Sequence, residues 1–356
     1  MSGLLDQTTQ IRKGEELDLA TLEPYLRAEL GLPDGDFALE QFPGGHSNLT
    51  YMARIGDREI VLRRPPYGSQ VKGAHDMGRE YTILSCIHDA YAPAPEPLFY
   101  CEDESVLGAK FYGMERINGV IFRTEKPEGL ELNEELVRGL CTSVVHNLAD
   151  LHAIDWKAAG LEQLKKPGTN FVERQVLGWA RRWESSKTEE MEDVDTVFNW
   201  CKERIPVDTD ATLIHNDYKF DNMILDSNDI TRIVGVLDWE MSTIGDPVFD
   251  LGVTLGYWID PGEPEGISTS RCFVQREPGA ITRQEYAEIY AAKTGRDISN
   301  LHYYYAFAII KLAVVIQQIY YRYATGKTTD ERFAGMIDGV RLLAKRAAQV
   351  VESETY

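Results

Sequence analysis

The sequence predicts an α+β fold with two unequal parts: a small, antiparallel, β-rich N-terminal lobe with one embedded helix, and a large, mainly helical C-terminal lobe. Strand-like runs separated by turn residues occupy the first third of the chain. Apolar residues at helical spacing dominate the remainder. With 356 residues, the chain is long enough to bury a core in each lobe.

The N-terminal lobe is expected to follow a flexible tail, residues 1–17, and to span residues 18–117. A short helix at 18–30 ends at Gly31, which is a common stop signal for helices. The strand-like runs are 37–42, 48–55, 58–63, 98–101 and 109–117, with a helix at about 76–90 before the last two. Turn residues join the first three runs, which predicts an antiparallel meander.

The C-terminal lobe is expected to span residues 118–356. Leu136, Leu140, Val144 and Leu148 lie on one stripe of a helix at 133–153. Further helical patterns occur at about 170–204, 248–259, 282–294, 299–325 and 330–352, and only the stretch 212–237 is strand-like again. A cleft between two such lobes is a usual place for a ligand.

Composition excludes several classes of partner. Lys and Arg total 37 against 57 Asp and Glu, a formal charge of -20, which is unfavourable for binding nucleic acid. The five cysteines are scattered without a C-x-x-C pair, so we expect reduced thiols and a cytoplasmic protein. The most apolar stretch, 303–321, is interrupted by Lys311, Gln317 and Gln318, which favours a buried core helix over a membrane span. The sequence leaves protein partners unknown.

The stretch LIHNDYKFDNMILD (213–226) contains the pattern H-x-D-x-x-x-x-N, formed by His215, Asp217 and Asn222. Asp238 follows the apolar run IVGVL, where a carboxylate is costly unless something such as a metal ion compensates it. These groups suit phosphoryl transfer, which needs a positioned hydroxyl, magnesium and positive charge. We expect Asp217 to orient or accept the proton of the hydroxyl, Asn222 and Asp238 to bind Mg²⁺, and Lys219 to reach the γ-phosphate. His215 is expected to fix the loop.

The stretches LIHNDYKFDNMILD and VGVLDWEMSTIGDPVFDLG resemble the catalytic and metal-binding motifs of the aminoglycoside phosphotransferase family. The resemblance covers about residues 35 to 340. It implies a bilobal, protein-kinase-like fold that binds ATP and Mg²⁺. The stretch FVERQVLGW (171–179) is similar to a subgroup that includes the kinase-like domains fused to acyl-CoA dehydrogenases.

A kinase-like fold also implies a cation on the third strand, paired with a glutamate on the following helix. Arg63 and Glu80 occupy those places, although the family more often has lysine on the strand. Arg64 is the alternative, because neighbouring strand residues face opposite sides. The loop FPGGHSNLTY would contact the phosphates through Gly44, Gly45, Ser47 and Asn48, and a plain hairpin turn explains its glycines equally well. The residues expected to contact adenine are Met114, Glu115, Arg116 and Ile117.

The sequence therefore predicts an ATP- and Mg²⁺-dependent phosphotransferase that acts on a hydroxyl of a small molecule. The acceptor stays open. The acidic run 188–195 suits a cationic aminoglycoside, whereas Arg174, Arg181 and Arg182 suit an anionic hydroxyacyl thioester or hydroxy acid. The alternatives are a regulatory, nucleotide-binding pseudokinase and a metal-dependent hydrolase, and the latter would need more histidine ligands than the chain offers.

Overall fold

The structure is a computed structural model that describes residues 6–43, 48–67, 76–168, 170–207, 210–261, 263 and 272–356. The chain forms two compact units. The first unit contains Met1–Ile121 and Asn222–Ser242, and the second contains Phe122–Asp221 and Thr243–Tyr356. The sequence-based division placed one boundary at residue 117, whereas in the structure the later segment 222–242 packs with the N-terminal part.

The first unit is built on a five-stranded antiparallel sheet with the strand order β1-β2-β3-β5-β4. The strands are β1 (Phe37–Gln41), β2 (Leu49–Ile55), β3 (Arg58–Arg64), β4 (Pro97–Cys101) and β5 (Phe111–Glu115). The α+β fold with a β-rich N-terminal part, predicted from the sequence, is confirmed.

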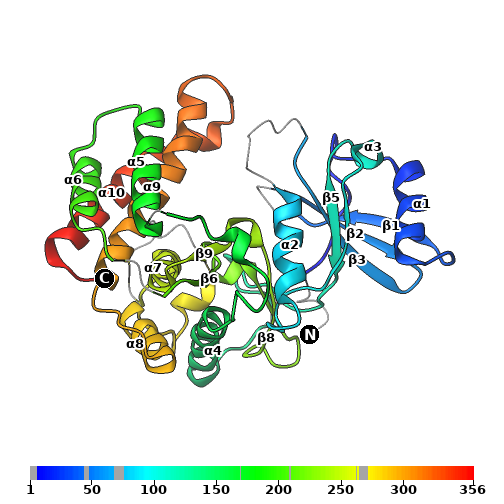
Figure 1. Cartoon of the computed structure of the whole chain (residues 1–356), viewed down its shortest axis with the longest axis horizontal. Helices are drawn as coiled ribbons and strands as arrows, with labels where there is room; N and C mark the ends of the chain where they lie inside the picture. The colour runs from blue at the N-terminus through cyan, green and yellow to red at the C-terminus, as the bar shows by residue number, and fades with distance from the viewer. Residues whose placement is uncertain are drawn as a thin grey trace. The chain divides into compact units, whose positions relative to one another are not determined.

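Two helices cover opposite faces of this sheet (Figure 1). Helix α1 (Leu19–Leu30) packs its buried Leu22 and Leu26 into a core with Leu62 of β3. Helix α2 (Met77–Ile87) packs on the other face, where Tyr81 stacks on Tyr100 of β4 with ring centroids 5.5 Å apart. Because side chains alternate along β3, Leu62 faces α1 and Arg63 faces α2. The short helix α3 (Glu104–Leu107) lies against α1.

A small hairpin completes the first unit. Strands β7 (Met223–Leu225) and β8 (Ile233–Val236) pair with each other, and the 3₁₀ turn η4 (Trp239–Met241) follows them. Val120 and Leu225 exchange two backbone hydrogen bonds of 2.8 Å, which attach this hairpin to the end of the N-terminal segment.

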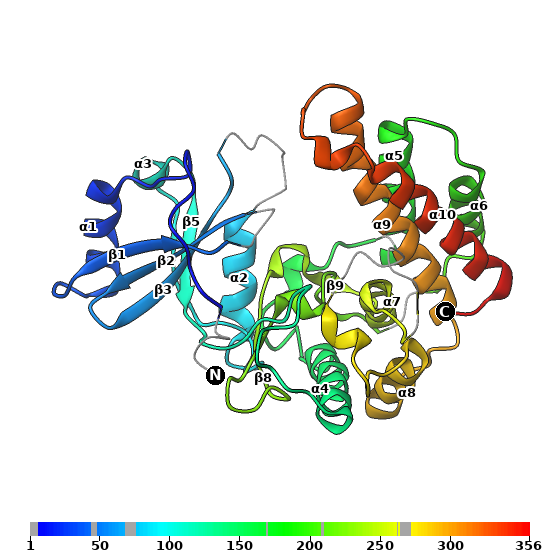
Figure 2. The ribbon, with the colours of Figure 1, turned by 180° about the vertical axis from the view of Figure 1, so that it is seen from behind.

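The second unit is mostly helical. Its helices are α4 (Glu134–His152), α5 (Phe171–Ser186), α6 (Glu192–Glu203), α7 (Pro247–Tyr257), α8 (Arg283–Thr294), α9 (Leu301–Ala324) and α10 (Met336–Ser353). Strands β6 (Thr212–Ile214) and β9 (Thr243–Gly245) form a two-stranded sheet. The 3₁₀ turns are η2 (Glu162–Leu164), η3 (Phe220–Asn222), η5 (Phe273–Arg276) and η6 (Glu331–Phe333). The last residue of η3, Asn222, belongs to the first unit. Helix α9 packs against α5, α6, α7 and α10, and Figure 2 shows it running beside α10.

Helix α9 is long and apolar enough to cross a membrane by length and composition, but 72% of its most apolar 18-residue segment is buried inside the protein. This is the behaviour of a core helix. The helical pattern at 170–204 differs from its prediction, because α5 and α6 are separate helices. The polar stretch between them makes a turn in which Lys187 forms ion pairs with Glu184 and Glu190.

Candidate active site

In the first unit, Arg63 binds two carboxylates from different segments. Its Nη1 lies 3.2 Å from Oε1 of Glu80 on α2, and its Nη2 lies 3.0 Å from Oδ1 of Asp238. Arg63 and Glu80 are both buried. The structure therefore brings together the strand cation, the helix glutamate and the aspartate after β8, three residues that were named from the sequence.

The charges in this cluster shift the pKa values of Arg63 and Glu80. Burial opposes the charge of Arg63, but Glu80 and Asp238 outweigh this effect, so the pKa of Arg63 lies above its ordinary value. Burial, together with the charges of Asp238 and Glu240, raises the pKa of Glu80 to about 7 against the opposing effect of Arg63. Glu80 Oε1 also accepts a hydrogen bond of 3.0 Å from the backbone N–H of Trp239. One glutamate thus orients both Arg63 and the backbone next to Asp238.

The β7–β8 hairpin places Asn222 and Asp238 at the same end of two paired strands. The backbone N–H of Leu237 donates a hydrogen bond of 2.8 Å to the carbonyl of Asn222. Asp238 follows directly and adopts a left-handed backbone conformation, with φ 68° and ψ 64°. A non-glycine residue in this region is strained and persists only where its surroundings hold it, which is common at functional sites.

This donor set fits a magnesium ion. An amide oxygen and a carboxylate are hard oxygen ligands, and protein Mg²⁺ sites commonly use one or two carboxylates completed by substrate phosphates. Among the residues that the structure describes, no cluster of three or more His, Cys, Asp or Glu could hold a metal ion by itself. In addition, the buried Nε of Arg63 has no acceptor within the described part of the chain, so an oxygen from a ligand could satisfy it.

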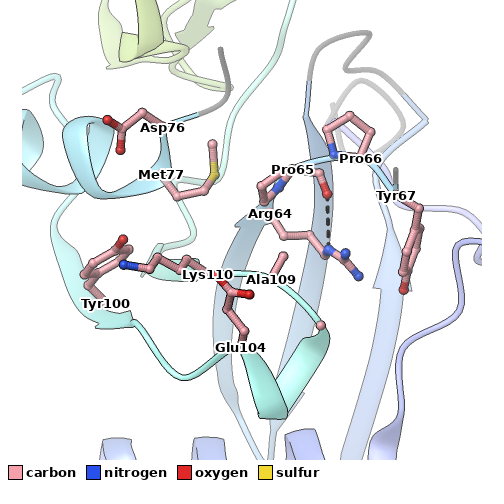
Figure 3. A pocket seen from close by; sticks show the side chains of 11 residues that line it. Arg64, Pro65, Pro66, Tyr67, Asp76, Met77, Tyr100, Glu104, Ala109 and Lys110 are labelled. Carbon is pink, nitrogen blue, oxygen red and sulfur yellow. Dashed lines mark hydrogen bonds between the residues drawn. The ribbon is translucent and has the colours of Figure 1, made fainter. Parts of the chain in front are cut away.

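Arg64, the next residue on β3, has different neighbours. Its Nε donates a hydrogen bond of 3.2 Å to the carbonyl of Pro65, and its guanidinium stacks over the Tyr67 ring at 3.9 Å. It lines a pocket of about 370 Å³ together with Asp76, Tyr100 and other residues of the first unit (Figure 3). Of the two arginines that the sequence left open, Arg63 is the one that contacts Glu80 and Asp238, and its role toward phosphates stays a prediction.

The other predicted nucleotide contacts have mixed surroundings. Gly44, Gly45 and Ser47 lie outside the described residues. Asn48 is buried, and its amide donates a hydrogen bond of 2.9 Å to Glu240, so it supports the turn after Asp238.

The four residues predicted to meet adenine are placed by β5 and the chain that follows it. Met114 is buried in β5, Glu115 accepts a hydrogen bond from the backbone of Glu96, and Ile117 is half-buried. The side chain of Arg116 donates to the carbonyl of Asp6. Their role toward a nucleotide stays a prediction.

In the second unit, the loop after β6 carries His215, Asn216 and Asp217. Asp250 of α7 holds this loop through its two carboxylate oxygens, which accept the backbone N–H groups of His215 and Asn216, each at 2.7 Å. His152 of α4 lies 3.1 Å from the same carboxylate. No signal in the sequence pointed to His152.

Asp250 carries its charge in a fully buried place. Burial raises the pKa of its carboxyl, but the hydrogen bonds and charges of His152 and His215 outweigh burial, so the pKa lies below its usual value. The carboxylate therefore stays ionised and can hold both N–H groups.

Asp217 and Lys219 form an ion pair at the end of this loop, with Lys219 Nζ 3.0 Å from Asp217 Oδ2. Both side chains are partly exposed, at 17% for Asp217 and 23% for Lys219, so a substrate could reach them. Nδ1 of His215, which is fully buried, accepts a hydrogen bond of 3.3 Å from the backbone N–H of Asp217. Asp217 is therefore supported from its own loop, while its carboxylate remains accessible beside an ammonium group.

Comparison with known proteins gives a consistent result. A family model described as a phosphotransferase enzyme family matches residues 38–276. The chain is 32% identical to mouse acyl-CoA dehydrogenase family member 10, over 91% of this chain and 30% of the mouse protein. It is 30% identical to chicken acyl-CoA dehydrogenase family member 11, over 96% of this chain and 44% of the chicken protein. The chain thus spans less than half the length of these relatives.

Solved structures show the same fold. A Ralstonia eutropha protein proposed to be an aminoglycoside phosphotransferase superposes with a TM-score of 0.79 at 27% identity, over 95% of this chain and 99% of that one. A ternary complex of the aminoglycoside phosphotransferase APH(4)-Ia with ADP and hygromycin B superposes with a TM-score of 0.59 at 16% identity, over 94% and 99% of the two chains. The second likeness concerns the fold alone.

Proposed function

Since the chain belongs to the phosphotransferase enzyme family, we propose that it transfers the γ-phosphate of ATP to a hydroxyl of a small molecule, with Mg²⁺ as the metal ion. The observation that carries this proposal is the ion-paired cluster of Arg63, Glu80 and Asp238 in the first unit. A buried ion-paired cluster is often no more stabilising than apolar residues of the same volume, so the presence of these charges is explained when the cluster binds phosphate oxygens and a cation.

The residues of the first unit would hold the nucleotide. The guanidinium of Arg63 donates in a planar fork that suits phosphate oxygens. Glu80 keeps Arg63 and the backbone at Trp239 in place. Asn222 and Asp238 would hold Mg²⁺, which when bound neutralises negative charge on the phosphates.

The residues of the second unit would act on the acceptor. Asp217 orients the acceptor hydroxyl and takes its proton as the hydroxyl oxygen bonds to the γ-phosphorus and the bond from that phosphorus to ADP breaks. Lys219, in contact with Asp217, places positive charge beside the transferring group. Asp250 keeps the loop rigid through its two backbone contacts.

Two acceptor classes are proposed for testing. A cationic aminoglycoside is supported by hygromycin B and kanamycin in the structurally similar complexes. A hydroxyacyl thioester or hydroxy acid is supported by the acyl-CoA dehydrogenase relatives, in whose longer chains this region occurs. The exposed Arg182 over the Trp179 ring, at 4.6 Å, is a cation that an anionic acceptor could use.

The test combines binding and turnover. ATP or ADP with Mg²⁺ should raise the melting temperature, which separates a nucleotide-binding protein from a hydrolase. The wild-type protein should then phosphorylate at least one compound in a panel of aminoglycosides, hydroxy acids and hydroxyacyl-CoA esters. In the Asp217→Asn variant kcat should fall on the order of 100-fold or more, with the nucleotide-induced shift retained.

The outcomes separate the alternatives. Turnover of the Asp217→Asn variant at the wild-type rate contradicts the role of Asp217. A wild-type protein that binds nucleotide but phosphorylates nothing in the panel supports the pseudokinase, which the replacement of the usual lysine by Arg63 favours. A protein that ATP and ADP do not stabilise contradicts both.

A further inference from the structure

Lys311 is a charged residue in the most apolar helix of the protein. It lies in the middle of α9, where residues 303–314 are all buried, and it is itself only 6% exposed. An ammonium group in such surroundings lowers stability unless it is compensated, and an apolar side chain of similar length would fit the helix better. The presence of lysine at this position therefore calls for a function other than packing.

The ammonium group of Lys311 reaches the catalytic loop. Its Nζ lies 3.5 Å from the carbonyl oxygen of Asn216, the residue immediately before Asp217. It also lies 5.8 Å from the centroid of the Trp179 ring of α5. Within the described part of the chain, Asn216 provides its hydrogen-bond acceptor.

Asn216 is the residue whose backbone needs support. It has a φ of 66°, in the left-handed region that a side chain disfavours. Its N–H is held by Asp250 of α7 at 2.7 Å, and its carbonyl faces Lys311 of α9. Both peptide groups of the strained residue are thus held by buried charges on two different helices.

The distance between these two helices is fixed by close packing. Gly252, two residues after Asp250, lies so close to Tyr304 that an added Cβ would come within 2.5 Å of the Tyr304 Cβ. Helices α7 and α9 pack against each other. The two supports of Asn216 therefore cannot move apart independently.

On the basis of the proposed function, we propose that Lys311 is a positioning residue, whose ammonium group clamps the Asn216 carbonyl and so aims the carboxylate of Asp217 at the acceptor hydroxyl. The charged groups that face Lys311 are Asp217 of the loop and Asp250 of α7, which favour its charge, and Lys219 of the loop and Arg182 of α5, which oppose it. Burial is the largest influence and lowers the pKa of Lys311 below its ordinary value.

The first experiment uses the full-length protein with Lys311→Met, and Lys202→Met on the exposed side of α6 as the matched control. The Lys311→Met variant should keep or raise the melting temperature, because a buried charge is removed. Its kcat should fall about 10- to 100-fold with little change in the KM for ATP, since a small misplacement of a catalytic group has this effect. A side chain that only packs would change the melting temperature and leave kcat intact. Wild-type kcat in the Lys311→Met variant overturns the inference.

The second readout does not depend on turnover. Hydrogen exchange of backbone amides in residues 213–221 should be faster in Lys311→Met than in wild type or in Lys202→Met, because the loop opens more readily. Unchanged exchange overturns the inference, whatever the enzyme phosphorylates. Conversely, a wild-type protein without kinase activity contradicts the proposed function and leaves the loop measurement standing.

The pH dependence of the wild-type protein provides a third test. The ammonium form of Lys311 donates a charge-assisted hydrogen bond, which is stronger than one from the neutral amine. Protection of residues 213–221, corrected for the intrinsic pH dependence of exchange, should therefore fall as the pH rises through the lowered pKa of Lys311. Constant protection up to pH 10 overturns the inference. In the wild-type protein kcat should fall over the same pH range, and in Lys311→Met this alkaline loss of kcat should be absent.

Discussion

Arg63 shows how much one side chain can depend on the protonation of its neighbour. Its guanidinium is shared between Glu80 and Asp238, and both Arg63 and Glu80 are buried. The raised pKa of Glu80 means that the folded protein takes up a proton there near neutral pH. The contribution of this cluster to the free energy of unfolding should therefore change at pH values around 7.

We expect Arg63→Met to lower the free energy of unfolding by roughly 3–5 kcal/mol at pH 8, because Glu80 loses its buried cation. At pH 6 the loss should be smaller. Glu80 has a higher pKa in the folded state than in the unfolded state. Its protonation therefore stabilises the folded protein at low pH, and this stabilisation is lost as the pH rises through about 7. Denaturant titrations at pH 6 and pH 8 measure this difference.

Arg64→Met is the matched control, since Arg64 is equally buried on the same strand but contacts Pro65 and Tyr67. Its effect on stability should not depend on pH between 6 and 8. Equal destabilisation of Arg63→Met at both pH values would contradict the coupling between Arg63 and Glu80.

At the scale of elements, α7 supports the loop after β6 through one carboxylate. In Asp250→Asn, at least one of the N–H groups of His215 and Asn216 loses its acceptor, at a cost of roughly 1–3 kcal/mol per buried group. The pKa of Asp250 is lower in the folded state than in the unfolded state. Its contribution is thus fully present above about pH 4, the unfolded value, and is lost as the pH falls below it.

The stability difference between wild type and Asp250→Asn should accordingly be constant from pH 7 to 5 and shrink between pH 4 and 3. Denaturant titration across this range measures it. Asp89→Asn, at a side chain that is 95% exposed, is the control and should change stability little at any of these pH values. A difference that stays constant down to pH 3 would mean that Asp250 is not held as an ion.

The packing of α7 on α9 gives a prediction about volume. Gly252→Ala should lower the free energy of unfolding by about 1–3 kcal/mol, because the new Cβ meets the side chain and backbone of Tyr304. Gly339→Ala in α10, where nothing lies within 4 Å of the added Cβ, should instead stabilise by about 0.5–1 kcal/mol through helix propensity. Thermal unfolding of both variants tests the contrast, and two shifts of the same sign would contradict it.

The elements show which parts of the structure the sequence could predict. Periodicity and turn residues were sufficient for the strands of the first sheet and for most helices, because those signals are local. The break between α5 and α6 was missed, since both flanking segments have helical patterns and only the polar turn at Lys187 separates them. Short elements such as α3 and β9 depend on tertiary contacts and carry little pattern of their own.

The same distinction between local signals and tertiary contacts applies to the residues of the candidate site. Asp217, Asn222 and Asp238 stand out because polar groups beside apolar strands are rare, and Arg63 and Glu80 followed from the resemblance. The choice of Arg63 over Arg64 required knowing which face of β3 is covered by α2. Lys311 looked like an interruption of an apolar helix, and its contact with Asn216, 95 residues away, is visible only in the fold.

At the scale of the whole molecule, the first unit is discontinuous in sequence. The segment 222–242 contributes the β7–β8 hairpin, the buried Trp239 and Asp238 to it. A fragment that ends at residue 121 should therefore not form a stable unit, because it lacks these contacts. Residue 120 pairs directly with residue 225, so a short linker could replace residues 122–221.

We expect a fusion of residues 1–121 to 222–242 through a three-residue Gly-Ser linker to unfold cooperatively on heating. Residues 1–121 alone should show no cooperative transition by circular dichroism. The same fusion with Trp239→Ala is the control and should be less stable by about 3–5 kcal/mol, as for a buried tryptophan. A cooperative transition in the fragment 1–121 alone would contradict the need for the hairpin.

The discontinuity also has a consequence during protein synthesis. Domains usually fold in order from the N-terminus as the chain leaves the ribosome. Here Arg63 can meet Asp238 only after the segment 222–242 has emerged, and by then the helical unit is outside only as far as α6. The nascent chain should therefore complete the Arg63–Glu80–Asp238 cluster late, and before that moment Arg63 can pair with Glu80 but not yet with Asp238.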